Sequence, residues 1–272
     1  HASMAVYNSY CDRVPVLLFL GNRLDATERN GFTAGAHAAQ DPAGLVRDFT
    51  KWDDSPVSLQ HFAESTVRGY QIAMTPPTEP VAIIVESALA DGMAPEGLRI
   101  PKLTLNAPPS GNVAAVKDAA RILVEAENPL IVAGRVARNA EGITLLVELA
   151  EALQAQVWDQ RQRMNFPTYH PLFTQADSGA DVILALDVRD HYGLGHRGNV
   201  KTGARTVDIS PVTLNHKSVY GEIGRYAEAD LSIPADPQAT LPALIEEVKR
   251  LTTGDRRRVF EERGASHAAT HL

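Results

Sequence analysis

Short apolar runs alternate with longer amphipathic stretches in the first part of the chain. The runs at residues 14–20 and 80–86 are rich in β-branched and aliphatic side chains, which predicts two buried strands. Between them, Ser55 is a candidate N-cap with Pro56 at the first helical position. Side chains that could face a core then recur at helical spacing, at Leu59, Phe62, Ala63, Thr66, Tyr70 and Ala73. The pattern predicts half of an α/β domain over residues 1–90.

Glycine and proline interrupt this pattern between residues 88 and 111. No helical or strand period is sustained there, and the breakers are Gly92, Pro95, Gly97, Pro101, Pro108, Pro109 and Gly111. Such a composition is typical of a connection between domains. We therefore expect a linker over residues 91–112.

A second alternation of helices and strands follows the linker, and it predicts a central α/β domain over residues 113–250. Helical patterns are expected from Val113 and around Ile143, and Asp236 is expected to cap a last helix that begins at Pro237. Strands are expected at residues 129–133, near Val157, at 181–187 and at 205–209. Residues 251–272 are charged and rich in alanine and histidine, so we expect a frayed helix or a linker.

The order of elements indicates the fold class. Strands that alternate with helices form parallel sheets, which helices cover on both faces. We therefore predict an α/β protein with a partial first domain and a complete, Rossmann-like second domain.

Composition narrows the classes of function. The 272 residues carry 26 basic and 33 acidic side chains, a formal net charge of −7, and the longest basic run is Arg256-Arg257-Arg258. This argues against a nucleic-acid partner. No apolar stretch approaches the roughly 20 residues of a membrane span, and no secretory signal is visible. The single Cys11 excludes an intramolecular disulfide framework. We expect a cytoplasmic protein without a membrane partner.

One glycine pattern could bind phosphate. Gly193, Gly195 and Gly198 match G-x-G-x-x-G, which in a dinucleotide fold brings main-chain N–H groups to a pyrophosphate. The pattern does not directly follow its strand, and the residues after it are a poor start for a helix. A flexible surface loop is the alternative interpretation.

Three residues next to predicted strands are candidate nucleotide ligands. Gly134 and Arg135 follow the strand at 129–133, and Asp208 lies near the end of the strand at 205–209. Ligands of open α/β sheets bind at the carboxyl ends of the strands. Arg135 could therefore face phosphate, and Asp208 could accept hydrogen bonds from ribose hydroxyls of FAD or ADP. The alternatives are an ordinary strand-to-helix turn for Gly134-Arg135 and a turn or N-cap role for Asp208.

The remaining candidates for chemistry are weak. Of nine histidines, only His191 and His196 lie close in sequence, at a spacing that does not suit metal binding from a helix. The chain has neither H-E-x-x-H nor G-x-S-x-G. We expect no bound metal at these histidines and surface positions for them.

Several segments resemble one enzyme family in their order. Residues 1–22 resemble the helix–strand segment in the second half of a pyrimidine-binding domain, and Lys51 lies in a stretch similar to the one before that domain's last helix. Residues 128–135, 207–211 and 229–234 are similar to strands of a central domain. The family is that of thiamine-diphosphate-dependent enzymes of the acetolactate synthase, benzoylformate decarboxylase and carboligase group.

This resemblance implies a decarboxylase or carboligase that acts on 2-oxo acids, a small-molecule substrate, thiamine diphosphate and magnesium as cofactors, and a homo-oligomer. It also makes Gly21 and Asn22 candidate cofactor contacts. The family's early glutamate and its Gly-Asp-Gly for magnesium and diphosphate have no counterpart here. We therefore expect a fragment that lacks the catalytic glutamate segment and the domain for magnesium and diphosphate, and that is inactive alone; the sequence names no catalytic residue. The alternative is a non-catalytic module that binds a nucleotide or bridges subunits.

Overall fold

The computed structural model describes residues 2–29, 38–160, 164–175, 179–188, 203–212, 226 and 228–271. The chain divides into two compact units, His1–Ala107 and Pro108–Leu272. Each unit contains its own parallel sheet. The division falls within the segment where glycine and proline interrupt the sequence pattern.

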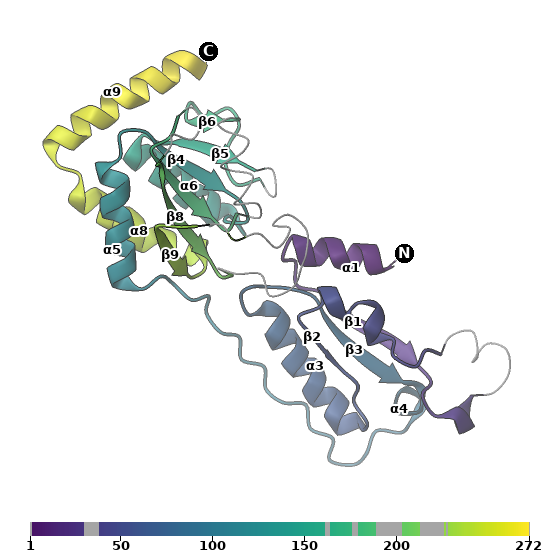
Figure 1. The fold of residues 1–272 in the computed structure, drawn as a ribbon. Helices are drawn as coiled ribbons and strands as arrows, with labels where there is room; N and C mark the ends of the chain where they lie inside the picture. The colour runs from purple at the N-terminus through teal and green to yellow at the C-terminus, as the bar shows by residue number, and fades with distance from the viewer. Residues whose placement is uncertain are drawn as a thin grey trace. The chain divides into compact units, whose positions relative to one another are not determined.

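Unit 1 is built on a three-stranded parallel sheet (Figure 1). Its strands are β1 (Leu17–Asn22), β2 (Trp52–Asp54) and β3 (Val81–Glu86), in the order β1-β3-β2. The helices are α1 (Ala2–Cys11), α3 (Leu59–Met74) and α4 (Ser87–Asp91), with short 3₁₀ turns at Ala26–Glu28, Ala43–Leu45 and Arg47–Phe49. β3 is the central strand, and its first four residues are buried.

Alternate residues of the strands of unit 1 face two different layers. On one face, Gly69 of α3 lies against side chains of Trp52, Leu17 and Ile83. The opposite face carries a cluster formed by Val6, Val46, Ala82, Leu18, Leu20 and Phe49. The glycine allows α3 to approach the sheet closely, and the small core is shared between the two faces.

The start of α3 differs from the sequence prediction. Ser58, not Ser55, is the N-cap: its side chain accepts a hydrogen bond from the His61 N–H. Ser55 instead donates its main-chain N–H to Asp54 Oδ1 at 2.9 Å, at the end of β2. Pro56 therefore lies outside the helix. Three-residue β2 carries too short a pattern to be recognised in the sequence.

Unit 2 contains a six-stranded parallel sheet in the order β6-β5-β4-β7-β8-β9. The strands are β4 (Pro129–Ala133), β5 (Gln156–Asp159), β6 (Phe173–Thr174), β7 (Val182–Leu186), β8 (Arg205–Ser210) and β9 (Leu231–Pro234). The chain runs outward from β4 to β5 and β6, and then continues from β7 on the other side of β4. The order therefore reverses between β4 and β7, which makes this pair the switch point of the sheet.

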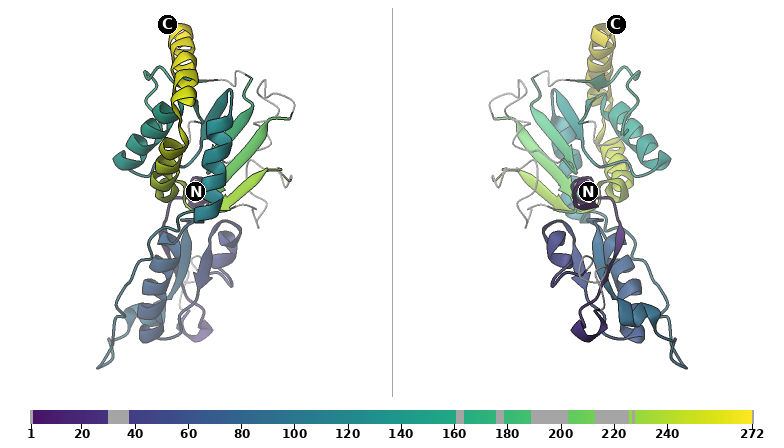
Figure 2. Two further views of the ribbon diagram at one scale, coloured as in Figure 1. Left: turned by 90° about the vertical axis from the view of Figure 1, so that its left-hand side faces the viewer. Right: turned by 90° about the vertical axis from the view of Figure 1, so that its right-hand side faces the viewer.

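Three helices cover one face of this sheet (Figure 2). They are α5 (Val113–Glu125), α6 (Ala140–Leu153) and α8 (Pro237–Leu251). The main core lies beneath them, and fully buried members include Leu123, Ile131, Leu146, Leu149, Leu184, Ile209 and Leu241. A smaller cluster on the other face contains Leu130, Val132, Ile183 and Ala185. The connections expected to bring helices to that face lie largely outside the described residues.

The last segment folds onto unit 2 instead of fraying. α9 (Gly254–His271) is a helix, and its Phe260 is buried in the main core cluster. The guanidinium of Arg263 donates to the carbonyl oxygens of Ala126 and Glu127, after α5, and to those of Leu153 and Gln154, at the end of α6. One charged side chain thus caps two helices, a tertiary contact that the polar sequence of this segment does not reveal.

Candidate functional site

The switch point of unit 2 is closed by hydrogen bonds between β4 and β7. The Gly134 N–H donates to the Leu186 carbonyl and the Arg135 N–H to the Asp187 carbonyl, each at 3.0 Å. A Cβ at Gly134 would lie 2.7 Å from the carbonyl carbon of Asp187 and 2.8 Å from the Cα of Val188. Glycine is required here because the two strand ends approach so closely.

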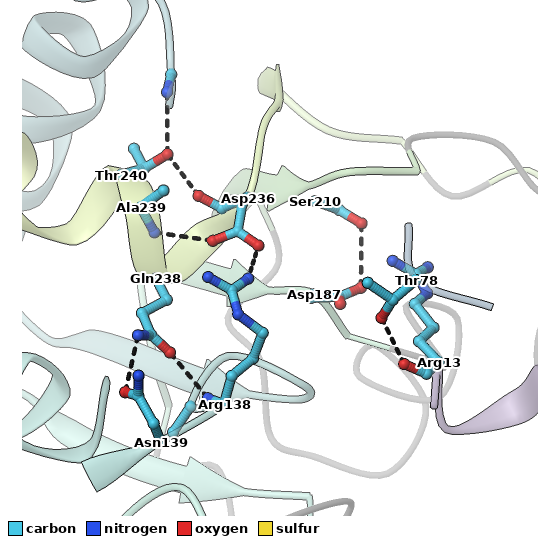
Figure 3. A network of polar contacts seen from close by, with 12 residues as sticks. Arg13, Thr78, Arg138, Asn139, Asp187, Ser210, Asp236, Gln238, Ala239 and Thr240 are labelled. Atoms are coloured by element: carbon cyan, nitrogen blue, oxygen red, sulfur yellow. Dashed lines mark hydrogen bonds and ion pairs between the residues drawn. The ribbon is translucent and has the colours of Figure 1, made fainter. Parts of the chain in front are cut away.

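The side chain of Arg135 is used within this closure. Its guanidinium lies 3.3 Å from Asp187 Oδ1, and both side chains are buried. Ser210 Oγ, at the end of β8, lies 3.2 Å from the same oxygen (Figure 3). Arg135 therefore faces a carboxylate of its own domain, whereas the sequence hypothesis placed a ligand phosphate there.

Asp208 lies within β8, two residues before its end. The flanking Val207 and Ile209 belong to the main core cluster, so the Asp208 side chain points to the other face of the sheet. In the register of the sheet it lies between Ala185 and Ser232, and it is buried. Gly134, Arg135 and Asp187 meet at the switch point, while Asp208 is set back along its strand.

A buried asparagine, which sequence reasoning missed, holds the next part of this edge. Asn165 Nδ2 donates to the Gly134 carbonyl at 2.8 Å and to Asp159 Oδ1 at 3.1 Å, and Asn165 Oδ1 accepts from the Ala137 N–H at 3.0 Å. The Asn165 N–H donates to Asp159 Oδ2 at 2.9 Å. The ends of β4 and β5 are joined through this one side chain. A lone Asn-Phe-Pro in sequence gives no signal of these contacts.

A second polar group connects the first turns of α6 and α8 (Figure 3). Arg138 forms an ion pair with the buried Asp236. Gln238 Oε1 accepts from the Arg138 N–H at 2.8 Å, and Gln238 Nε2 donates to Asn139 Oδ1 at 2.9 Å. Asp236 also caps α8 by accepting from the Ala239 N–H at 2.8 Å, which confirms the cap predicted from the sequence.

In unit 1, the candidate cofactor contacts Gly21 and Asn22 differ in their surroundings. Asn22 is buried, and its side chain donates to the Ala39 carbonyl and accepts from the Ala39 N–H. A Cβ at Gly21 would meet no atom within 4 Å. Asn22 therefore holds the chain at Ala39, and Gly21 lies beside open space.

The side chain of Lys51 is bound by main-chain carbonyl groups. Its ammonium group donates to the carbonyl oxygens of Ile72, Thr75 and Pro77, at distances from 2.7 to 3.0 Å. These carbonyls lie at the end of α3 and just beyond it. Burial lowers the pKa of the Lys51 amine. The lysine thus caps α3 and fixes the turn that leads into β3.

Other sequence candidates give no site in the described part of the chain. Gly193, Gly195, Gly198, His191 and His196 lie outside the described residues. Within the described ranges, no three His, Cys, Asp or Glu side chains are grouped as metal ligands. None of the helices in those ranges has the length and apolar character needed to span a bilayer.

Residues 116–244 match the family model described as "Thiamine pyrophosphate enzyme, central domain". The matched residues make up 129 of the 272 in the chain, and over them unit 2 is similar to the central domain of thiamine pyrophosphate enzymes. The match begins in α5 and ends in α8. It therefore includes the polar edge of unit 2, by which we mean the polar residues at the carboxyl ends of its strands and in the first turns of α6 and α8.

Similar proteins and solved structures extend the likeness to unit 1. A sulfoacetaldehyde acetyltransferase of Rhodobacter capsulatus is 26% identical over 201 residues, which are 68% of this chain and 32% of that protein. A Mycobacterium smegmatis protein described as a thiamin diphosphate-dependent enzyme superposes with a TM-score of 0.75 at 20% identity, over 94% of this chain and 49% of that one. Benzoylformate decarboxylase from Polynucleobacter necessarius superposes with a TM-score of 0.73 at 18% identity, over 91% of this chain and 47% of that one. The chain thus spans about a third of the first relative and about half of each solved structure.

Proposed function

We propose that this chain forms the central domain and part of the pyrimidine-binding domain of a thiamine-diphosphate-dependent enzyme that decarboxylates or joins 2-oxo acids. The supporting observation is that 94% of the chain, and so elements of both units, has counterparts in one half of a thiamin diphosphate-dependent enzyme. Agreement over one Rossmann-like domain alone would be weaker support, since that architecture serves many functions.

The finer assignment, to acetolactate-synthase-like decarboxylases and carboligases, rests on the order of the matching segments. One solved structure with this fold carries the name benzoylformate decarboxylase, and one sequence relative carries the name sulfoacetaldehyde acetyltransferase. A small 2-oxo acid is the substrate class we propose for the intact enzyme. In the family the cofactor stabilises a carbanion, and the protein binds and orients it.

The described residues do not fit a complete site for magnesium and thiamine diphosphate. They contain no group of three carboxylate, imidazole or thiol side chains placed to hold a metal. Asn22 is engaged with Ala39, and the Lys51 ammonium group is engaged with three carbonyls. We assign this chain a supporting role, in which it positions neighbouring parts of the enzyme, and we assign no catalytic step to its residues.

A subunit-bridging role is the second candidate. In the described residues β1 has a strand partner on one side only, and the Phe19 side chain on this strand is 49% exposed. A strand edge with an exposed aromatic residue can pair with another chain. This role is compatible with the enzyme proposal, because enzymes of many families are oligomers.

The test of function uses the protein purified from its native source, together with any polypeptides that accompany it. Release of CO₂ from pyruvate and from benzoylformate is measured with and without added thiamine diphosphate and Mg²⁺. We expect cofactor-dependent release from at least one 2-oxo acid of a wider panel. No release from any member of the panel, with the cofactors bound, contradicts the proposed reaction.

The supporting role is tested separately with residues 1–272 alone. Calorimetric titration with Mg²⁺ and thiamine diphosphate should give no saturable binding. A dissociation constant in the low micromolar range would show that this chain holds a complete cofactor site, contrary to the assignment.

A further inference from the structure

The loop between β4 and α6, residues 134–139, and the first turn of α6 occupy the position where dinucleotide-binding folds present N–H groups to a phosphate. In such folds the loop after a strand and the first turn of the following helix point their donors at the ligand. The direction of those donors therefore decides whether unit 2 can bind FAD or ADP there. Five of them have acceptors within unit 2: the N–H groups of Gly134, Arg135, Ala137, Arg138 and Gly142.

The first two donors bind β7 and its end. Gly134 donates to Leu186 and Arg135 donates to Asp187. A Cβ added at Gly134 would overlap the Asp187 carbonyl group, so the two strand ends lie directly against each other. These two N–H groups are therefore used between the strand ends and do not point at a ligand.

Asn165 satisfies the third donor from the side of β5. It is fully buried, and its Oδ1 accepts from Ala137. Its main-chain and side-chain N–H groups bind both carboxylate oxygens of Asp159, the last residue of β5. An acidic residue at the end of the second strand is the group that binds ribose hydroxyls in a dinucleotide fold. Here Asn165 takes those hydrogen bonds instead.

Gln238 satisfies the fourth donor from the side of α8. Its Oε1 accepts from Arg138, and its Nε2 donates to Asn139, whose Oδ1 in turn accepts from the Gly142 N–H at 3.0 Å. A Cβ at Gly142 would lie 2.5 Å from Gln238 Oε1, so the amide group lies directly against the first turn of α6. The first turn of α6 is therefore covered by a neutral side chain of the same domain.

Among the described residues, the buried charges at this edge also disfavour a phosphate. Asp159, Asp187, Asp208 and Asp236 are all buried on these strands or next to their ends. Arg135 pairs with Asp187, and Arg138 pairs with Asp236. Four carboxylates and two guanidinium groups give these six residues a formal charge of −2. A nucleoside diphosphate would bring further negative charge into a partly desolvated environment, where repulsion is stronger than in water.

We propose that Asn165 and Gln238 are internal ligands of the β4–α6 loop, and that they take the place of a nucleotide at this edge of unit 2. The two amide side chains join the ends of β4 and β5 to the first turns of α6 and α8. Unit 2 then acts as a rigid scaffold that does not bind FAD or ADP at Gly134, Arg135 and Asp208. This inference goes beyond the proposed function, since that function holds with or without a bound nucleotide.

Two NMR measurements on the full chain test the inference: amide hydrogen exchange without ligand, and a titration with ADP. The Ala137 and Arg138 amides should be protected at least tenfold over exposed loop amides, and ADP up to 1 mM should shift neither signal. Exchange as fast as in an exposed loop, or binding of ADP below 1 mM with shifts at these two amides, would overturn the inference.

Two single variants separate the internal ligands from general stabilisation. Gln238→Ala should accelerate exchange at Arg138 by about tenfold or more and leave Ala137 protected, whereas Asn165→Ala should do the reverse. Gln60→Ala in unit 1 is the matched control, because Gln60 binds the main chain of Arg99 there. If Asn165→Ala does not fold, Gln238→Ala decides alone. An unchanged Arg138 amide in Gln238→Ala contradicts the proposal.

Discussion

Gly134 lies in direct contact with the main-chain carbonyl group of Asp187, and this contact joins the ends of β4 and β7 where the strand order of unit 2 reverses. Asp187 adopts a left-handed conformation with φ 48°. Its carbonyl accepts from the Arg135 N–H, and its carboxylate pairs with the Arg135 guanidinium. The contact between Gly134 and Asp187 therefore sets the spacing of the two strand ends, and the Asp187 carboxylate balances the charge of Arg135 there.

Replacing Gly134 by alanine should destabilise the protein. The added methyl group would overlap main-chain atoms, which cannot move aside as a side chain can. We therefore expect the free energy of unfolding to fall by about 1–3 kcal/mol or more. The matched control is Gly254→Ala, because a Cβ at Gly254 meets nothing within 4 Å. Thermal unfolding should show a lowered Tm for Gly134→Ala only. Equal Tm values for the two variants would contradict the close contact.

Replacing Arg263 by alanine should release α9. The guanidinium binds four carbonyl oxygens at the ends of α5 and α6, and hydrogen bonds to a charged group contribute roughly 1.5–3 kcal/mol. We expect faster proteolysis within α9 and a lower unfolding midpoint in denaturant. Arg258→Ala is the control, since this exposed side chain forms a long, 3.7 Å ion pair with Asp255. Similar cleavage of both variants would show that Arg263 does not hold the helix.

Docking of α9 should weaken in mild acid. Burial, and next the charge of Arg263, lowers the pKa of His267 in the folded protein. As the pH falls from about 6.5, the ordinary value, the unfolded state takes up the proton before the folded state does. The contribution of His267 to stability is therefore fully present above about pH 6.5. It is lost as the pH falls from there towards the lower pKa of His267 in the folded protein. Hydrogen exchange of α9 at pH 7.5 and 5.5 should show this loosening in the native sequence and less of it in His267→Gln. An equal change in both would exclude His267 as the cause.

The chain should associate at micromolar concentration through β1. Within the described residues, β3 pairs on both sides, whereas β1 pairs on one side. Pairing of two copies along this edge would cover Phe19. Light scattering should give a dimer or a larger species, and Phe19→Glu should shift it towards monomer. A monomeric native sequence would refute this interface.

The sequence predicts elements whose cause is local. The strand at 129–133 and the helix that begins after Asp236 were placed correctly, because a continuous apolar run and an N-cap followed by proline are short-range signals. The helix after β2 was expected with the wrong cap, since Ser55 and Ser58 both precede its apolar pattern and only the contact with Asp54 distinguishes them.

The polar edge of unit 2 could be predicted only in part. Gly134 and Arg135 were expected at the carboxyl end of β4, and they lie there. Their neighbours Asn165 and Gln238 come from segments that are distant in sequence, and their roles arise only when β5 and α8 pack beside β4 and α6. The docking of α9 likewise depends on one buried arginine in an otherwise polar helix.

The thiamine diphosphate content of the native protein tests the central claim most directly. The protein is purified from its source with its accompanying polypeptides, denatured, and assayed for thiamine diphosphate as fluorescent thiochrome. The proposed function predicts about one molecule of cofactor per copy of this chain, after incubation with thiamine diphosphate and Mg²⁺ if necessary. Absence of the cofactor from the folded native protein under both conditions would contradict the claim that this chain is part of a thiamine-diphosphate-dependent enzyme.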